Sequence, residues 1–222
     1  MNKKITFLIL SGPTKEYIDP VRYISNESSG RMGSALAEVA IKKGYDVIFI
    51  SGPAKVLPKD VKVIDVLTAL DMFKATQLNF KKANIVINAA AVADYRSAKI
   101  SKHKIKKDCT SSLMTIKLKQ NPDIIKYCGE NKKNQVIVGF ALETKDLIKN
   151  ALIKLKNKSL DLVIANGVGA FNSKNATVNI ITPNSILEIK NRNKNIIAEK
   201  IINETVRIFK NIKLCKDNSR RL

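Results

Sequence analysis

Short runs of almost entirely apolar residues recur along this chain, and longer segments with helical spacing separate them. We expect strands at residues 5–10, 47–50, 61–66, 85–91, 136–140 and 160–165. A strand that is apolar at nearly every position is covered on both faces, which is typical of parallel sheets flanked by helices. The pattern therefore predicts an α/β fold with a doubly wound, Rossmann-like, mostly parallel sheet.

Apolar residues three or four positions apart predict the helices between these strands. The expected helices span residues 32–43, 69–80, 123–128, 145–156 and 196–209. One further strand-like stretch, residues 113–118, lies within a polar, lysine-rich region. Helical connections of this kind are what a parallel sheet requires.

The pattern changes after residue 175, where apolar and polar residues begin to alternate. Residues 177–182 and 186–190 flank Pro183-Asn184-Ser185, which predicts a C-terminal β-hairpin extension. No linker interrupts the chain, so we expect a single domain over residues 1–212. We expect residues 213–222 to form a charged, frayed tail.

The chain is strongly basic, with a formal net charge of +21 over 222 residues. Such a charge is compatible with nucleic-acid binding. Lysines are spread along the whole chain, however, while aromatic residues make up only 5% and tryptophan is absent, so no stacking platform for bases is apparent. We therefore expect anionic small molecules and no nucleic acid as partners, and keep a basic nucleic-acid-binding protein as an alternative.

Nothing in the sequence points to a membrane or to secretion. The first apolar run is too short for a signal peptide, and no stretch is long enough to span a bilayer. Cys109, Cys128 and Cys215 are odd in number and form no CxxC, which supports neither a disulfide framework nor a zinc site. We expect a cytoplasmic protein that contacts no membrane.

An unusually long loop joins the first strand to the first helix. It begins with Ser11-Gly12-Pro13 and ends with Ser28-Ser29-Gly30. Backbone N–H groups at a helix N-terminus lack intrahelical partners and the helix dipole attracts anions, so phosphates fit there. In a simpler interpretation, the serines only cap the helix. The loop also carries Asp19, Arg22 and Asn26, which suggests that it holds a substrate as well as phosphates.

Two common nucleotide-binding patterns are missing from the sequence. It contains no GxGxxG, and Ser51 follows the second strand where a dinucleotide site has an acidic residue for the ribose. It contains no GxxxxGKS or GxxxxGKT either, which disfavours a P-loop NTPase. A Rossmann-type NAD(P)-binding oxidoreductase therefore remains only as an alternative. His103 is the only histidine and lies in a lysine-rich loop, which disfavours a Ser-His-Asp triad.

Several short motifs lie at the ends of the expected strands, where open α/β sheets bind ligands. They are NAAAVADYR at 88–96, KIKK at 104–107, NPDI at 121–124 and GFALET at 139–144. Together with IDPVRYISNESSGRMG at 18–33, and in this order, they resemble phosphopantothenate–cysteine ligase, also called phosphopantothenoylcysteine synthetase. The resemblance extends from Ile5 to about Thr205. The chain looks like the free-standing bacterial form of this ligase domain, without the flavin-dependent decarboxylase half.

The resemblance implies a reaction in two steps. The carboxylate of 4′-phosphopantothenate attacks the α-phosphate of CTP, which gives an acyl-cytidylate and pyrophosphate. The amine of L-cysteine then attacks the activated carbonyl and releases CMP. Mg²⁺ and CTP are implied and no flavin is expected. The family is homodimeric, and the hairpin at about 175–190 matches its dimerisation region.

The resemblance also implies roles for individual residues. Asn26 would hold the acyl-cytidylate, and Lys104 would lie in a flexible strap over the site. The implied nucleotide-binding residues are Gly12, Ser28, Ser29, Gly30, Asn88, Ala89, Ala90, Asp94, Lys104, Asn121, Pro122, Asp123, Ile124, Phe140, Lys154 and Lys158. Asp94 is also the candidate Mg²⁺ ligand, since Mg²⁺ beside a triphosphate takes carboxylate oxygens. Without the resemblance, Asp94 could be a helix cap and Phe140 a core residue.

Three positions depart from the family pattern. Pro13 stands where the family usually has a second glycine, which removes a backbone N–H donor from the first loop. Arg31 replaces a lysine and so keeps the charge but changes the geometry. Leu142 replaces an alanine, which we expect to change packing only. CTP and ATP are not distinguished by the sequence.

Overall fold

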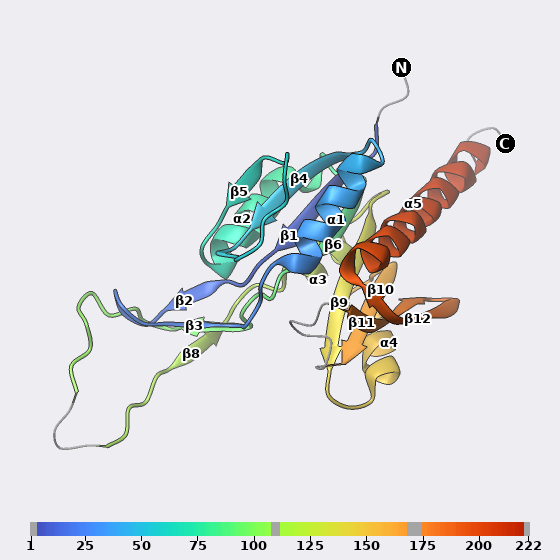
Figure 1. The fold of residues 1–222 in the computed structure, drawn as a ribbon. Coiled ribbons are helices and arrows are strands. Elements are labelled where there is room, and N and C mark those ends of the chain that lie inside the picture. The colour runs from blue at the N-terminus through green and yellow to red at the C-terminus, as the bar shows by residue number, and fades with distance from the viewer. Residues whose placement is uncertain (1–3, 108–111, 168–174, 220–222) are drawn as a thin grey trace.

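An eight-stranded sheet runs through the part of the chain that the computed structural model describes, residues 4–107, 112–167 and 175–219 (Figure 1). Its strands are β1 (Thr6–Ser11), β4 (Asp46–Ser51), β5 (Val63–Asp65), β6 (Ile85–Asn88), β9 (Val136–Glu143), β10 (Leu162–Gly167), β11 (Asn175–Thr182) and β12 (Ser185–Asn193). The helices are α1 (Arg31–Lys42), α2 (Ala69–Phe80), α3 (Ile124–Asn131), α4 (Leu147–Asn157) and α5 (Lys194–Ser219).

The strand order, β12-β11-β10-β9-β6-β1-β4-β5, confirms the doubly wound, Rossmann-like fold. The strands from β10 to β5 are parallel neighbours, and the hairpin β11–β12 adds two antiparallel strands at the edge. The chain builds outward from β1 to β4 and β5, and then returns to place β6 on the other side of β1. Open α/β sheets bind ligands at such a point of reversal, beyond the carboxyl ends of the strands.

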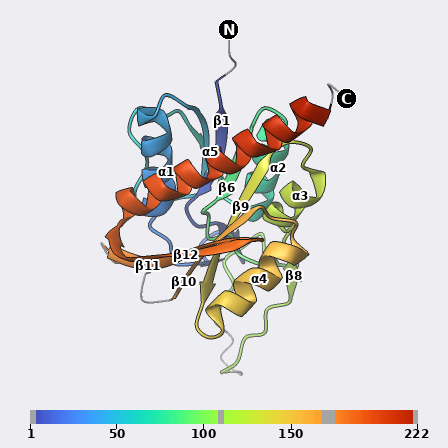
Figure 2. The same cartoon turned by 90° about the vertical axis from the view of Figure 1, so that its right-hand side faces the viewer.

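The side chains of β1 show how the sheet is covered on both faces. Phe7 and Ile9 belong to a core closed by α1 and α5, whereas Leu8 and Leu10 belong to a core closed by α2, α3 and α4. All four side chains are fully buried. Figure 2 shows α5 crossing in front of the sheet. This burial on both faces is the physical reason for the continuous apolar run in the sequence.

Two short antiparallel strand pairs project from the sheet (Figure 1). β2 (Lys15–Tyr17) pairs with β3 (Tyr23–Ser25), and β7 (Tyr95–Ser97) pairs with β8 (Leu118–Gln120). We call residues 15–25, 95–107 and 112–120 the arm. The sequence predicted only a strand at 113–118 in this region. In the structure β8 begins at Leu118, because only residues 118–120 lie opposite β7.

Several other boundaries also differ from the prediction; β9 and α3, for example, each end three residues later than expected. The strand expected at 85–91 ends at Asn88, whose side chain accepts a hydrogen bond from the Ala90 N–H at 3.2 Å and so turns the chain. The last helix continues to Ser219, so it includes residues 213–219 that we expected in the tail. In the described ranges, no helix combines the length and the apolar character needed to cross a membrane.

The first long loop packs tightly against the loop that follows β4. A Cβ atom on Gly52 would lie 1.7 Å from the carbonyl oxygen of Pro13. Backbone cannot yield as a flexible side chain can, so only glycine fits there. The position of the first loop therefore depends on the lack of a side chain at residue 52.

We expect Gly52→Ala to destabilise the protein by roughly 3 kcal/mol, because overpacking a rigid site has about this cost. Gly167→Ala is the control, since a Cβ there would meet nothing within 4 Å. Urea unfolding at matched protein concentration measures both variants. Equal midpoints for the two would contradict the proposed close packing.

Candidate functional site

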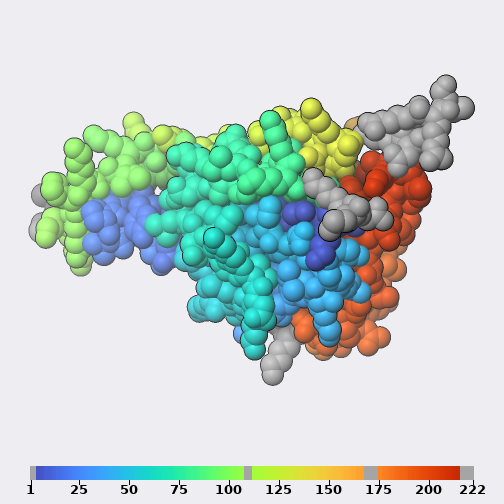
Figure 3. All heavy atoms as spheres, turned by 90° about the horizontal axis from the view of Figure 1, so that it is seen from above, coloured from blue at the N-terminus to red at the C-terminus, as the bar shows by residue number. Residues whose placement is uncertain are grey.

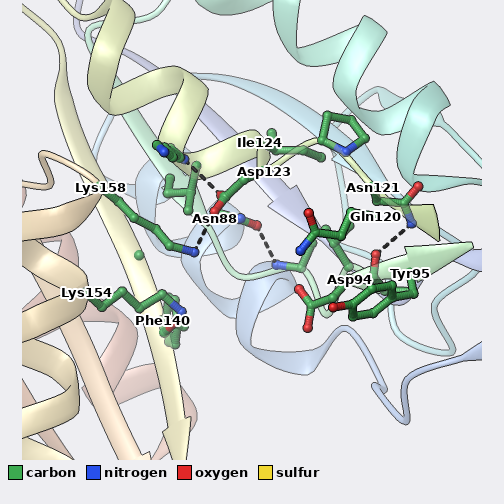
Figure 4. Close-up of a pocket in the computed structure, with 17 residues that line it drawn as sticks. Asn88, Asp94, Tyr95, Gln120, Asn121, Asp123, Ile124, Phe140, Lys154 and Lys158 are labelled. Carbon is green, nitrogen blue, oxygen red and sulfur yellow. Dashed lines mark hydrogen bonds and ion pairs between the residues drawn. The ribbon is translucent and has the colours of Figure 1, made fainter. Parts of the chain in front are cut away.

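A cavity of about 560 Å³ lies beside the end of β6 and the N-terminus of α3 (Figure 4). Its lining comes from β6 and the loop after it, from β7, β8 and α3, and from β9 and α4. The lining residues are Asn88, Ala90, Val92, Ala93, Asp94, Tyr95, Gln120, Asn121, Pro122, Asp123, Ile124, Ile125, Lys126, Gly139, Phe140, Lys154 and Lys158. The cavity is therefore adjacent to the chain reversal at β1 and β6, where the fold class predicts a ligand.

The loop that leads into α3 is held firmly against the loop that follows β6. The Asn121 side chain donates a hydrogen bond to the Ala93 carbonyl at 2.7 Å, and the Asn121 N–H donates to the Asp94 carbonyl at 2.8 Å. Arg96 donates to the Asn121 side-chain oxygen at 2.8 Å. These bonds fix the N-terminus of α3 at the cavity, where its dipole favours an anion.

Two lysines, Lys154 in the last turn of α4 and Lys158 at its C-cap, reach the cavity from the other side. Lys154 and Lys158 are one helical turn apart and both line it, as the i, i+4 spacing predicted. The ammonium group of Lys154 donates to the Phe140 carbonyl at 2.5 Å, and that of Lys158 pairs with the Asp123 carboxylate at 2.8 Å. Figure 4 shows both lysines on the wall opposite Asp94 and Tyr95.

The charges in the cavity influence one another. Burial, and to a lesser extent the neighbouring Lys158, lowers the pKa of Lys154 below its usual value. Burial raises the pKa of Asp123, but the hydrogen bonds from Lys158 and the Lys126 N–H outweigh this and leave the pKa lowered. Asp123 is also the N-cap of α3. Its carboxylate is therefore kept ionised as the partner of Lys158.

Asp94 brings one carboxylate to the opposite wall of the cavity. Among the described residues, no group of three or more His, Cys, Asp and Glu side chains is placed to hold a metal ion. A closed, all-protein metal site is therefore not what the cavity offers. One carboxylate does suit Mg²⁺, which commonly takes its other ligands from nucleotide phosphates and water.

The first loop approaches this region without lining the cavity. Gly12 and Gly30 adopt positive φ angles of 75° and 78°, and the helix cap at Gly30 involves no side-chain hydrogen bond. The serines before it therefore do not cap α1. The Asn26 side chain donates to the carbonyls of Ala91 and Val92 at 3.3 and 3.0 Å, which ties the loop to the wall of the cavity.

Pro13 takes part in the same contact between loops. It forms an isolated parallel bridge with Ala91, in which the Ala91 N–H donates to the Gly12 carbonyl at 2.9 Å. This contact uses the carbonyl of Gly12 and needs no N–H from residue 13. The proline is thus compatible with the way the two loops pair.

The structure gathers part of the expected site around one cavity. The expected residues that line it are Asn88, Ala90, Asp94, Asn121, Pro122, Asp123, Ile124, Phe140, Lys154 and Lys158. Those that do not line it are Gly12, Asn26, Ser28, Ser29, Gly30, Ala89 and Lys104. The sequence-based list missed Tyr95 and Gln120, which face each other across β7 and β8. Their pairing joins segments 25 residues apart in the sequence, and no local pattern signals it.

Comparison with known proteins agrees with this architecture. Residues 2–208 match the family described as the DNA/pantothenate metabolism flavoprotein C-terminal domain. The chain is 45% identical over 204 residues to the coenzyme A biosynthesis bifunctional protein CoaBC of Borreliella burgdorferi, which covers 90% of this chain and 52% of that protein. It is 39% identical over 211 residues to the protein of the same name from Escherichia coli strain K12, with 92% and 52% covered.

A solved structure is similar over nearly its whole length. The crystal structure of the C-terminal domain of a coenzyme A biosynthesis bifunctional protein CoaBC superposes with a TM-score of 0.81 at 33% identity, covering 93% of this chain and 96% of that chain. The chain spans about half the length of the curated relatives that it matches. It belongs to the family of DNA/pantothenate metabolism flavoprotein C-terminal domains, which confirms the resemblance that its motifs indicated.

Proposed function

We propose that this chain is a phosphopantothenate–cysteine ligase, which joins 4′-phosphopantothenate to L-cysteine through an acyl-cytidylate formed from CTP. The observation that carries the proposal is the cavity, where the α3 N-terminus, Lys154 and Lys158 face Asp94. Membership of the family supports the same reaction. Such a reaction needs positioned charges more than a protein nucleophile.

The positive side of the cavity is suited to the nucleotide phosphates. Lys154 and Lys158 supply ammonium groups, and the first turn of α3 supplies backbone N–H groups directed at an anion. Asp94, on the opposite wall, would hold Mg²⁺ together with phosphate oxygens. Mg²⁺ would supply neutralisation of the charge on the phosphates. The protein's own part is to orient the α-phosphate toward the attacking carboxylate.

The position of Asn26 at the boundary between the two loops supports a role for it in the reaction. Its side chain already contacts the backbone at residues 91–92, next to the cavity wall. If it releases one of these two bonds, of which the bond to Ala91 is the longer, the amide can donate a hydrogen bond to the acyl carbonyl while the cysteine amine attacks. We propose this role for Asn26 in the second step of the reaction.

The structure offers no support at the end of β4 for the alternative of an NAD(P)-dependent oxidoreductase. β4 ends at Ser51, whose hydroxyl donates to the Gly52 carbonyl at 2.8 Å. No carboxylate stands at that residue to bind a ribose, as a dinucleotide site requires. The ligase therefore remains the better-supported proposal.

We propose a reducing cytoplasm as the compartment. Cys128 is a buried free thiol, and Cys109 lies outside the described residues. Burial raises the pKa of the Cys128 thiol to about 12, so it stays protonated and unreactive at neutral pH. Thiols of this kind fit a compartment in which disulfides are not formed.

We also propose that the protein is a homodimer. The sequence-based expectation places the contact at the hairpin β11–β12, where Ile186 and Leu187 are 52% and 50% exposed. The arm carries a larger set of exposed apolar side chains: Val21, Tyr23, Tyr95, Ile100, Leu113, Met114 and Leu118. Two-stranded pairs are marginally stable alone, and exposed apolar surface of this extent is typical of an interface. A second copy of the chain packed on the arm would stabilise the two-stranded pairs and would bury the exposed apolar side chains.

Incubation with 4′-phosphopantothenate, L-cysteine, Mg²⁺ and either CTP or ATP tests the ligase reaction. We expect repeated turnover, with pyrophosphate and nucleoside monophosphate both accumulating, only when every component is present; without L-cysteine the reaction stops at the acyl-cytidylate after its first release of pyrophosphate. Asn26→Asp is expected to release pyrophosphate but to stall before the cysteine adduct. If the unchanged protein releases no pyrophosphate with either nucleotide, the proposed function is wrong. If Asn26→Asp forms the cysteine adduct at the normal rate, Asn26 has no role in the mechanism.

Truncation of Lys154 tests the assignment of the cavity. We expect Lys154→Ala to weaken binding of CTP with Mg²⁺ roughly tenfold or more, because a hydrogen bond to a charged group is lost. Lys156→Ala removes the same charge from an exposed position of α4 and is expected to change the Kd by less than about twofold. Isothermal titration calorimetry measures both. Equal affinities of the two variants for CTP would show that the nucleotide does not bind beside Lys154.

The dimer proposal is tested by placing charges on each surface in turn. Sedimentation velocity of the unchanged protein at micromolar concentration should show a dimer. We expect Val21→Glu with Ile100→Glu to dissociate it, because burying an unpaired carboxylate is costly. Ile186→Glu with Leu187→Glu is the matched variant on the hairpin. If only the variant with Ile186→Glu and Leu187→Glu dissociates, the interface lies at the hairpin β11–β12. If the unchanged protein is a monomer, neither the arm nor the hairpin forms a dimer interface.

A further inference from the structure

The segment that carries Lys104 is attached to the first loop, although the two are about eighty residues apart in the sequence. The Ser101 N–H donates to the Ile18 carbonyl at 2.9 Å. The Ile105 N–H donates to the Asp19 carboxylate at 3.1 Å, and Arg22 donates to the Ile105 carbonyl at 2.8 Å. Figure 3 shows the two segments, in blue and bright green, in contact within the arm.

Asp19 is the centre of this attachment. Its side chain is fully buried, which is costly for a carboxylate unless it is paired and hydrogen-bonded. One oxygen accepts hydrogen bonds from the N–H groups of Val21 and Arg22, both at 2.8 Å. The other accepts from the Arg22 guanidinium at 3.0 and 2.5 Å and from the Ile105 N–H.

The two oxygens have different tasks. Bonds to the N–H groups two and three residues ahead close a local turn, and one oxygen is sufficient for this. The second oxygen accepts the hydrogen bond from the Ile105 N–H. The local turn does not require this bond. Arg22 reinforces that contact, because the same guanidinium holds the Asp19 carboxylate and the Ile105 carbonyl. The charge-assisted bonds make the attachment stronger than a neutral pair would.

Lys104 is the neighbour of the residue that is held. Its side chain is exposed and does not line the cavity, so its reach toward the substrates is set by where its backbone is fixed. The bonds to residues 101 and 105 lie on both sides of it. The backbone position that these bonds fix therefore sets where the Lys104 side chain can reach.

We propose that Asp19 is a positioning residue for the ligase reaction: acting with Arg22, it fixes the backbone at Ile105 and so determines where Lys104 is presented. The proposal rests on the proposed function, and it assigns Asp19 no contact with substrate. It makes two separate demands. The attachment must exist in solution without any substrate, and its effect on the reaction must pass through Lys104.

Amide hydrogen exchange of the substrate-free protein tests the first demand. We expect Asp19→Asn to speed exchange at the Ile105 N–H about tenfold or more, because the amide loses its charged acceptor. Asp46→Asn is the control, since Asp46 is exposed and lies at the start of β4, outside the arm. Unchanged exchange at Ile105 in a folded Asp19→Asn protein would overturn the proposal.

A second variant covers the case in which Asp19→Asn does not fold. Arg22→Lys keeps the positive charge and the local turn but cannot hold the carboxylate and the Ile105 carbonyl at once. We expect it to speed exchange at Ile105 as well, by a smaller factor. No change in exchange with this variant would likewise overturn the proposal.

A double-variant cycle on kcat tests the second demand. We expect Asp19→Asn to lower kcat for pyrophosphate release about tenfold, and the double variant Asp19→Asn, Lys104→Ala to be no slower than Lys104→Ala alone. If Asp19 were only structural, the two losses in kcat would multiply in the double variant. That result would overturn the proposal. Lack of turnover by the unchanged protein would instead overturn the ligase function, a result that the exchange measurement does not depend on.

Discussion

The burial of β1 on both faces is the constraint on which the rest of the structure depends. Its four central side chains are fully buried, two under α1 and α5 and two under α2, α3 and α4. Burying one such side chain contributes roughly 2 kcal/mol, so the four together contribute about 8 kcal/mol. Uncovering either pair would remove about 4 kcal/mol, which is a large part of a domain's net stability of roughly 5–15 kcal/mol. Neither helix layer is therefore dispensable, and β1 must lie in the middle of the sheet.

A central β1 also creates the site. Because the chain builds first to one side of β1 and then to the other, the loops after β1 and β6 are left facing each other at the same edge. There they pair through Pro13 and Ala91 and through the Asn26 side chain. The α3 N-terminus and α4 then close the cavity from the far side of β6. Fold and site thus follow from the same reversal of strand order.

The sequence predicted the parts of the molecule that depend on local patterns. The six parallel strands and the hairpin were recognisable because burial makes their residues apolar or alternating, as in β1 and β11. Lys154 in α4 and Lys158 at its C-cap were placed on one face by their spacing alone. The arm escaped prediction because β2, β3, β7 and β8 are three residues long and mostly polar. Roles such as that of Asn26 came only from the order of family motifs, since an asparagine in a turn has no distinctive pattern of its own.

The two ammonium groups on the α4 side of the cavity are each held by another group of the protein. Lys158 is paired with Asp123, and Lys154 is bound to the Phe140 carbonyl. A buried ammonium without a partner would be costly, and these contacts orient both lysine side chains. The triphosphate that we propose as ligand would compete with one carboxylate and one carbonyl, but it carries several negative charges and would gain the α3 dipole as a further partner. The arrangement therefore favours a polyanion over a singly charged ligand, because only a polyanion can compensate for the contacts that it displaces.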